Sequence, residues 1–203
     1  MFSLRKPSVE DIRHFIVRQH DQTFSYPFVG ATQNTPPPGY DVDHNRIQLG
    51  TGPITFERAK AALRRWEMFN LGWVQPHWPD APIMVNSPVA VIAHVCGLWV
   101  TNACRVVYVQ EEMGPIEKFG FAYGTLPAHV ERGEERFLVQ WDHSDDSVWY
   151  DLLAISQPNH ILARLGYLYV RHLQRRFAQD SLRAMQQATI GKSVRSGGGS
   201  LSC

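Results

Sequence analysis

The sequence predicts an α+β domain in which a curved antiparallel sheet packs on a long C-terminal helix, with a further helix and a long loop near the N-terminus. Three observations support this class. Between residues 73 and 156 apolar residues recur with a period near two, as in strands. After residue 158 the period returns to three or four, as in a helix. The turns between the strand segments are short, which favours antiparallel neighbours, because a parallel crossover needs about a dozen residues.

Length and composition narrow the class of protein. The chain has 203 residues, enough to bury one core without a disulfide framework or a structural metal. Its 20 Lys and Arg against 19 Asp and Glu argue against binding to nucleic acid or to an anionic membrane. No segment has the roughly 18 consecutive apolar residues of a membrane helix, and no signal peptide follows the first ten residues. Three cysteines favour a reducing compartment.

We therefore expect one cytoplasmic domain over residues 1–187, with no cofactor, no bound metal and no membrane span. Residues 188–203 include Gly197, Gly198, Gly199 and Ser200 and carry little apolar surface. A segment of this composition cannot offset the entropy of ordering, so it is expected to be a flexible tail.

The N-terminal third alternates helix and loop signals. Ser8, followed three residues later by Asp11, is typical of a helix start, and Ile12, Phe15 and Ile16 form one apolar stripe. Prolines and glycines between residues 20 and 40 predict a long surface loop. A strand is expected over Asn45–Leu49. A helix starting near Thr55 is then expected to bury Phe56, Ala59, Leu63 and Trp66.

The central region predicts an antiparallel meander. Trp73–Gln75 and Ile83–Val85 are weaker strand candidates. The stronger candidates are Val89–Cys96, Cys104–Glu111, Phe119–Thr125, Glu135–Asp142 and Ser147–Ser156.

The segment Phe119–Thr125 alternates aromatic residues with Gly120, Ala122 and Gly124, so one face of this strand is aromatic and the other nearly bare. If residues 126–133 close a hairpin, an apolar patch forms across two strands. The expected pairs are Phe119 with Trp141, Phe121 with Val139, and Tyr123 with Phe137. The next hairpin adds Val148, Tyr150 and Leu152. The glycines and Ala122 permit curvature or close approach of a helix.

The C-terminal helix is expected to start near Asn159, a possible cap, and to end near Gln187. Gly166 is expected to divide it into a short and a longer helix. Its apolar stripe is formed by Leu162, Leu165, Tyr169, Leu173 and Phe177.

Two features carry candidate chemistry. His129, Glu131, Glu134 and Glu135 cluster after the aromatic strand, where a carboxylate and an imidazole could share acid and base work; the alternative is a solvated hairpin tip. Asp151, within an apolar strand, requires a partner if buried, and Arg105 or Arg175 could supply it. That pair would be either an internal strut or the polar anchor of a cavity.

The spacing of His94, Cys96 and Cys104 matches no zinc motif. Cys96 and Cys104 either face each other in a hairpin turning near Val100, close enough for a disulfide, or remain free thiols. The sequence contains neither a glycine-rich phosphate loop before a helix nor a nucleophile elbow.

Several ordered motifs lie between residues 25 and 186: Val29–Thr32, Phe56–Ala59, Cys104–Val109, Phe119–Pro127 with His129, Gly133–Phe137, Val148–Asp151 and Ser156–Phe177. Together they resemble the domain-of-unknown-function family nineteen-ninety of bacteria and plants. One departure is Leu168, where proline commonly follows the Gly-Tyr pair in that family.

The resemblance implies a helix-grip-like fold, similar to the birch-pollen allergen, START lipid carriers and polyketide cyclases, with an apolar cavity between sheet and terminal helix. By pattern alone the aromatic face is more often a plain core than a cavity wall, and the resemblance brings the two readings level. The first functional expectation is binding of a small apolar or amphipathic molecule. The alternatives are a cyclase- or hydrolase-like enzyme, and an interaction module that docks a protein through surfaces such as Pro36–Gly39. The candidate ligand-binding residues are Arg105, Tyr108, Phe119, Phe121, Tyr123, His129, Glu135, Phe137, Tyr150 and Asp151.

Overall fold

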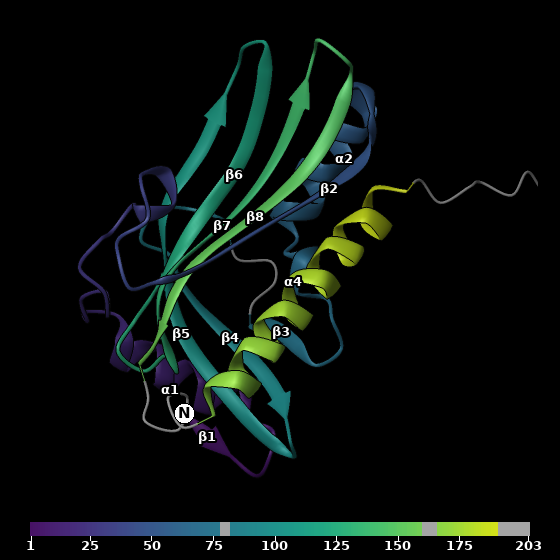
Figure 1. Ribbon diagram of the computed structural model, residues 1–203. Coiled ribbons are helices and arrows are strands. Elements are labelled where there is room, and N and C mark those ends of the chain that lie inside the picture. The colour runs from purple at the N-terminus through teal and green to yellow at the C-terminus, as the bar shows by residue number, and fades with distance from the viewer. Residues whose placement is uncertain (78–81, 160–165, 191–203) are drawn as a thin grey trace, which may run out of the picture.

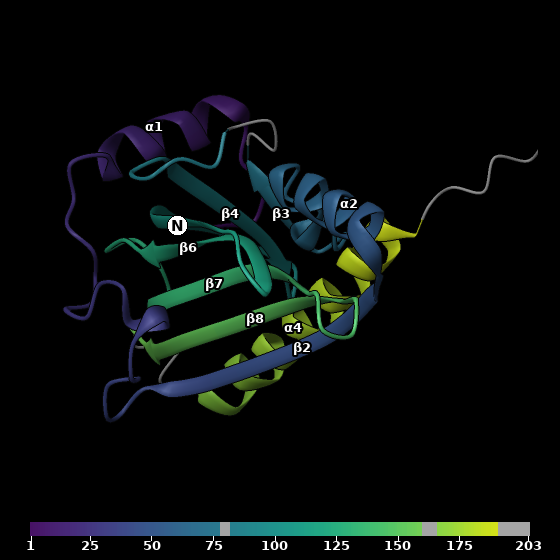
Figure 2. The same cartoon turned by 90° about the horizontal axis from the view of Figure 1, so that it is seen from above.

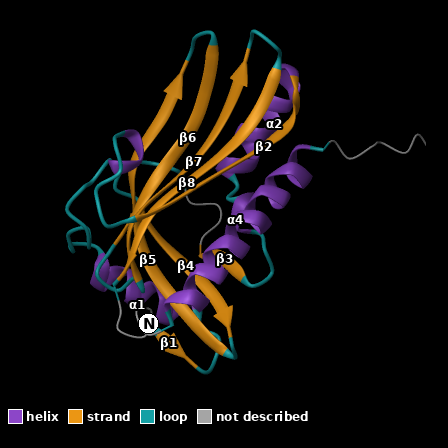
Figure 3. Cartoon of the chain, in the orientation of Figure 1, coloured by secondary structure: helices purple, strands orange, loops and turns teal. Residues whose placement is uncertain are grey.

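The computed structural model describes residues 1–77, 82–159 and 166–190. Its helical elements are α1 (Val9–Gln19), η1 (Ala31–Gln33), α2 (Gly52–Arg64), η2 (Glu67–Phe69) and α4 (Tyr167–Thr189). Its strands are β1 (Phe2–Ser3), β2 (Asp41–Thr51), β3 (Val74–His77), β4 (Pro88–Val95), β5 (Leu98–Glu112), β6 (Ile116–Thr125), β7 (Glu131–Asp142) and β8 (Ser147–Pro158). Figure 3 shows where the strands and the helices lie in the fold.

The strands form one antiparallel sheet in the order β2-β8-β7-β6-β5-β4-β3, with β1 added beside β5. Strands β3 to β8 follow one another as a meander, and β2 pairs with β8 at the far edge. The sheet is strongly curved, and α4 runs obliquely across its concave side (Figure 1). The predicted α+β class and the sheet packed on a C-terminal helix are confirmed.

Two hydrophobic layers flank the sheet. The larger lies on the concave face, where α2, η2 and α4 pack over residues such as Phe121, Phe137 and Tyr150. The smaller lies on the convex face, where Ile12, Phe15 and Ile16 of α1 cover the alternate residues of β4 and β5. Figure 2 shows α1 and α4 on opposite sides of the sheet. No helix within the described segments is long and apolar enough to cross a membrane.

Local sequence signals explain the helix starts. Ser8 and Asp11 form the predicted capping box: the Ser8 hydroxyl accepts from the Asp11 amide at 3.1 Å, and Asp11 accepts from the Ser8 amide at 2.9 Å. Helix α2 begins at Gly52, earlier than predicted, with Pro53 in its first turn. Trp66 is buried as expected but lies beyond the end of α2, with φ of 57°.

The strand predicted over Ile83–Val85 is wrong. The chain turns here: the Ser87 amide donates to the Met84 carbonyl at 3.0 Å, and Asn86 has φ of 70°. A left-handed residue cannot continue a strand, and apolar composition alone did not reveal this turn. The weaker candidate near Trp73 corresponds to β3, which is displaced to Val74–His77.

The predicted register between β6 and β7 is also wrong, by two residues. Phe119 pairs with Val139, Phe121 with Phe137, and Tyr123 with Glu135. Strand β7 starts at Glu131, so the connection is shorter than the predicted loop over residues 126–133. An even shift leaves every side chain on its predicted face, and the aromatic patch survives.

The face of β6 that carries Gly120 and Gly124 allows neighbouring groups to approach the strand closely. A Cβ on Gly120 would lie 2.8 Å from the Cα of Leu138 in the neighbouring strand, so only glycine fits there. A Cβ on Gly124 would collide with Tyr26, whose loop crosses the convex face. The predicted close approach is therefore made by the loop before β2, not by a helix.

Helix α4 spans Tyr167–Thr189, two residues past the predicted end near Gln187, and Gly166 precedes it. The short helix predicted around Leu162 and Leu165 lies outside the described residues, as does most of the expected flexible tail. Cys96 and Cys104 are both free: Cys96 lies in the exposed β4–β5 turn and Cys104 is buried. That turn falls at Cys96–Gly97 instead of near Val100.

Candidate functional site

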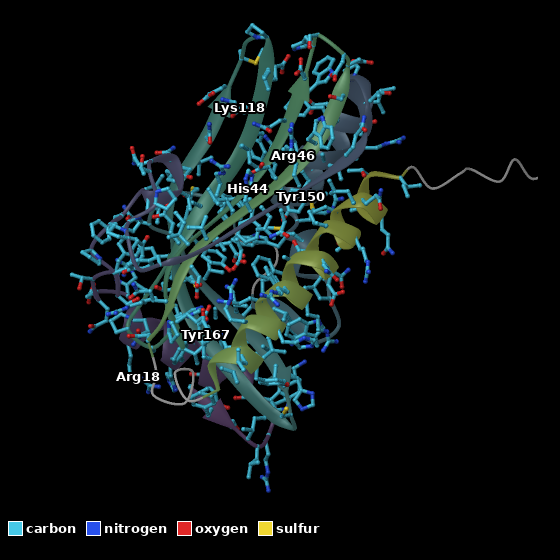
Figure 4. The ribbon with its side chains drawn as sticks, in the orientation of Figure 1. Arg18, His44, Arg46, Lys118, Tyr150 and Tyr167 are labelled. Atoms are coloured by element: carbon cyan, nitrogen blue, oxygen red, sulfur yellow. The ribbon has the colours of Figure 1, made fainter. Side chains whose placement is uncertain are left out.

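A cavity of about 420 Å³ lies between the concave face of the sheet and α4. Its walls are mostly apolar, with residues from β4, β5, β8, η2 and α4. Phe2, Leu98 and Tyr169 line it and are also substantially exposed, so the cavity meets solvent near the β4–β5 turn and the start of α4. Figure 4 shows side chains from the sheet and α4 facing each other across this region, with Tyr150 on the α4 side of the sheet.

A cluster of polar side chains, here called the polar end, lies on β6, β7, β8 and α4. The Tyr123 hydroxyl donates to Oε2 of Glu135 at 2.6 Å. Nε2 of Gln174 lies 2.7 Å from both carboxylate oxygens of Glu131 and 3.0 Å from the Ser156 hydroxyl. Strand alternation aims these groups inward, because Tyr123 pairs with Glu135 and Glu131 is four residues from Glu135 on β7. All five line the cavity.

Burial sets the acidity of the polar end. It raises the pKa of Glu135 to about 7, and the nearby charges of Glu131 and Asp43 act in the same direction against the Tyr123 hydrogen bond. Burial likewise raises the pKa of Glu131 to about 7, against the effects of Gln174 and Arg171. Two carboxyl groups therefore change protonation state near neutral pH inside one cavity.

The other ionisable groups near the polar end are fixed in state or already paired. Burial lowers the pKa of His129 to about 4, so its imidazole is neutral near pH 7; its Nδ1 lies 2.9 Å from the Glu131 amide. Arg171 of α4 binds Asp43 of β2 through both terminal nitrogens, at 2.5 and 2.7 Å. Burial raises the pKa of Tyr123 well above its usual value, so its phenol stays protonated.

Aromatic rings form part of the cavity wall near Glu135. Phe69 lies with its ring centroid 5.3 Å from that of Phe177 and 6.1 Å from that of Tyr123. Trp73 also lines the cavity; its indole nitrogen donates to Asp180 at 3.0 Å, and the guanidinium of Arg176 lies 4.5 Å from its ring. The polar end thus adjoins an aromatic wall.

A further acid, the buried Glu134, points its carboxylate to the convex side. It accepts from the Tyr26 hydroxyl and the Gly30 amide, both at 2.7 Å, and from the amide and hydroxyl of Thr32 at 3.0 and 2.5 Å. These bonds fasten the loop before β2 to the sheet. The Thr32 hydroxyl also lies 2.7 Å from that of Tyr108.

Asp151 is buried, as predicted, but its expected partners are wrong. Arg136 donates to its Oδ1 at 2.8 Å, and Nε2 of His44 lies 2.6 Å from its Oδ2. Arg105 instead donates to the carbonyls of Gln19 and His20 at the end of α1. Partners across adjacent strands depend on register, which the sequence alone left open.

The structure brings together only part of the predicted site. Tyr123, His129 and Glu135 line the cavity. Arg105, Tyr108 and Asp151 make their hydrogen bonds on the convex side. The remaining candidates belong to the buried core on the concave face beneath α2, η2 and α4: Phe119, Phe121, Phe137 and Tyr150.

The polar cavity residues that the sequence did not predict include Gln174 and Asp43. They lie on elements far apart in sequence, and only the packing of α4 over β2 and β8 brings them to Glu131 and Glu135. Glu131 was recognised only as one of a charged cluster. Within the part of the chain that the structure describes, no group of His, Cys, Asp and Glu side chains is arranged to hold a metal ion.

Sequence comparison identifies the family. The model of the family described as "Domain of unknown function (DUF1990)" matches residues 25–184. A protein of Dictyostelium discoideum named "UPF0548 protein" is 37% identical over 207 residues, covering 93% of this chain and 95% of the relative. The chain belongs to this family, as its motifs indicated.

Structure comparison agrees with the fold. A hypothetical protein of Helicobacter pylori is similar with a TM-score of 0.51 at 10% identity, over 82% of this chain and 96% of that protein. Human STARD10 is similar with a TM-score of 0.46 at 12% identity, over 91% and 80% of the two chains. The curved antiparallel sheet packed on α4 is itself the helix-grip-like arrangement that the sequence predicted (Figure 1).

Proposed function

We propose that this member of the DUF1990 family binds a small apolar or amphipathic molecule in the cavity between its sheet and α4. The observation that carries the proposal is the cavity itself, about 420 Å³, with mostly apolar walls and one polar end. Ligand pockets typically measure about 300–1,000 Å³ and combine apolar walls with a few placed polar groups. Protein interiors are otherwise packed with few voids larger than a water molecule, so a space this large is not ordinary packing.

A cavity-filling variant tests the proposal. Ala154 lines the cavity on β8, paired with Glu135 and with Asp43. Ala154→Phe places a ring in the space, and Leu153→Phe adds a ring on the opposite face as the matched control. The probe is the neutral dye N-phenyl-1-naphthylamine, whose fluorescence rises in apolar surroundings. Circular dichroism and urea unfolding confirm that both variants fold.

The native protein and Leu153→Phe should bind the dye with one site, and Ala154→Phe should bind on the order of tenfold more weakly or worse, since the dye's contact surface is lost. Equal binding by the two folded variants, or no binding by the native protein, contradicts the proposal.

Proton transfer to a bound molecule is the second candidate function, favoured by the two carboxyl groups with a pKa of about 7 in one cavity. A general acid or base works best when its pKa lies near the working pH. The residues able to act within the cavity are Glu135 and Glu131, with Tyr123 as a hydrogen-bond donor; Asp151 lies on the other face.

Solvent exchange tests this candidate without knowledge of the substrate. The ionised carboxylate of Glu135 would remove an α-proton from bound 2-decanone, and the enolate would regain a deuteron in D₂O. The native protein should accelerate deuterium incorporation, followed by NMR, and Glu135→Gln should lose the acceleration. Exchange at the buffer rate with the native protein, under conditions where the ketone displaces the dye, counts against catalysis.

A further inference from the structure

We propose that the ligand carries a cationic nitrogen, a protonated amine or a quaternary ammonium, held between the carboxylate of Glu135 and the rings of Phe69, Tyr123 and Phe177. The apolar remainder of the molecule then extends between the sheet and α4 toward the cavity mouth. This inference rests on the proposed binding function and names the class of molecule bound.

The charged residues that line the cavity in the described segments are all acidic. They are Asp43, Glu131, Glu134 and Glu135, of which Glu134 turns its carboxylate to the convex side, and no described Lys or Arg is among the lining residues. The guanidinium of Arg171, whose charge acts on Glu131, is engaged by Asp43 through both terminal nitrogens. No Lys or Arg of the described segments forms an ion pair with Glu131 or Glu135, and an anionic ligand such as a fatty acid would add a third negative charge beside them.

One acceptor at this site is open. Oε2 of Glu135 accepts from Tyr123, but Oε1 receives no hydrogen bond from any described residue. An ionised carboxylate presents about four lone-pair sites, and a half-buried one gains from a charged donor. Glu131, by contrast, has both oxygens on the amide of Gln174. Glu135 is thus the carboxylate with room for a ligand donor.

Aromatic rings lie near that carboxylate. Tyr123 is bonded to Glu135 and lies 6.1 Å, centroid to centroid, from Phe69, which in turn lies 5.3 Å from Phe177. The negative faces of such rings attract ammonium groups, most strongly where water is excluded. Trp73, on the same wall, already has a guanidinium 4.5 Å from its ring. A carboxylate and aromatic rings are the two kinds of group that attract an alkylammonium head.

The rest of the lining fits an apolar tail. Val74, Val91, Ala93 and Val95 of β3 and β4 line the cavity opposite Leu173 of α4. Half-exposed Phe2 and Leu98 continue this apolar surface to the mouth. An extended alkyl chain would bury its length here while its nitrogen remains at Glu135.

Chain-matched probes test the inference. Decyltrimethylammonium and decylamine are cations, decanol is neutral, and decanoate is an anion, all of equal alkyl length. Each is titrated below its micelle concentration against the bound neutral dye at pH 8. Both cations should displace the dye with about tenfold higher affinity than decanol, and decanoate should be weakest, because the charge-assisted contacts favour only the cations.

Glu135→Gln should reduce the ratio of cation affinity to decanol affinity toward one. The control Glu112→Gln removes the same charge from an exposed carboxylate on β5, where Glu112 pairs with Lys118, and should keep the native ratio. The inference is overturned if decanol or decanoate matches the cations, or if the ratio survives in Glu135→Gln. Failure of the dye and of every probe to bind would instead contradict the binding function itself.

Discussion

Removing the carboxyl group of Glu135 should make the protein more resistant to unfolding at alkaline pH. The pKa of Glu135 rises from an ordinary 4.5 to about 7, chiefly because of burial. A folded state that binds the proton more tightly than the unfolded state loses stability as pH rises. For Glu135 this loss begins near pH 4.5, grows toward pH 7 and is complete above it. Glu135→Gln carries no such charge, so its stability does not fall in this way as the pH rises.

The magnitude follows from the shift. The difference between a pKa of 4.5 and one of about 7, at about 1.4 kcal/mol per unit, corresponds to about 3.5 kcal/mol, of which about 2.5 kcal/mol develops between pH 5 and pH 8. His129 acts in the opposite sense, because its lowered pKa of about 4 costs stability as pH falls through the range from 6.5 to 4. That contribution is common to both proteins and cancels when they are compared. The charge of Glu131 adds to the shift, so part of the effect belongs to the pair.

Urea unfolding at pH 5, 6, 7 and 8 measures the effect. The free energy of unfolding of Glu135→Gln, relative to the native protein, should increase by about 2–3 kcal/mol from pH 5 to pH 8. Glu57→Gln, which removes an exposed carboxylate from α2, should show a flat difference. A difference for Glu135→Gln that varies by less than about 0.5 kcal/mol would refute the reasoning, because it would mean that the carboxyl group is as well solvated as Glu57.

Three further predictions concern neighbouring groups. Glu131→Gln should lower the pKa of Glu135, since it removes a like charge; carboxyl ¹³C NMR measures this, and an unchanged pKa would show that the two acids do not interact. Glu134→Ala should lower the free energy of unfolding in urea by roughly 3 kcal/mol or more, because donors of the loop before β2 lose their acceptor. A loss below about 1 kcal/mol would show that water replaces the carboxylate as the acceptor. With the third cysteine replaced by serine, iodoacetamide should label exposed Cys96 quickly and buried Cys104 only on unfolding; mass spectrometry showing equal labelling contradicts the burial of Cys104.

The sequence predicted the faces of strands better than their partners. Alternation placed Phe121 and Tyr123 on one face, and both are buried there. It could not fix the start of β7, so the pairing with β6 was wrong by two residues. The same limit applies to Asp151, whose partner Arg136 lies on the adjacent strand and was not foreseen. Side-chain direction is a local property, whereas register depends on the whole hairpin.

The candidate site was predicted in part for a related reason. Phe119, Phe121 and Phe137 share the concave face with Tyr123, but α2 and η2 cover the first three. Trp66 of the α2–η2 junction lies 4.9 Å from Phe121, centroid to centroid, and Phe69 of η2 lies 5.4 Å from Phe137. The cavity lies where α4 spans the sheet. Alternation distinguishes the two faces of a strand but not a filled part of a face from an open one.

A crystal structure of the protein with bound decylamine would test the central claim most directly. The account predicts that the amine nitrogen lies about 3 Å from the carboxylate of Glu135, with the alkyl chain between β4 and α4. A cavity filled by rearranged side chains, or an amine bound only on the outer surface, would contradict it.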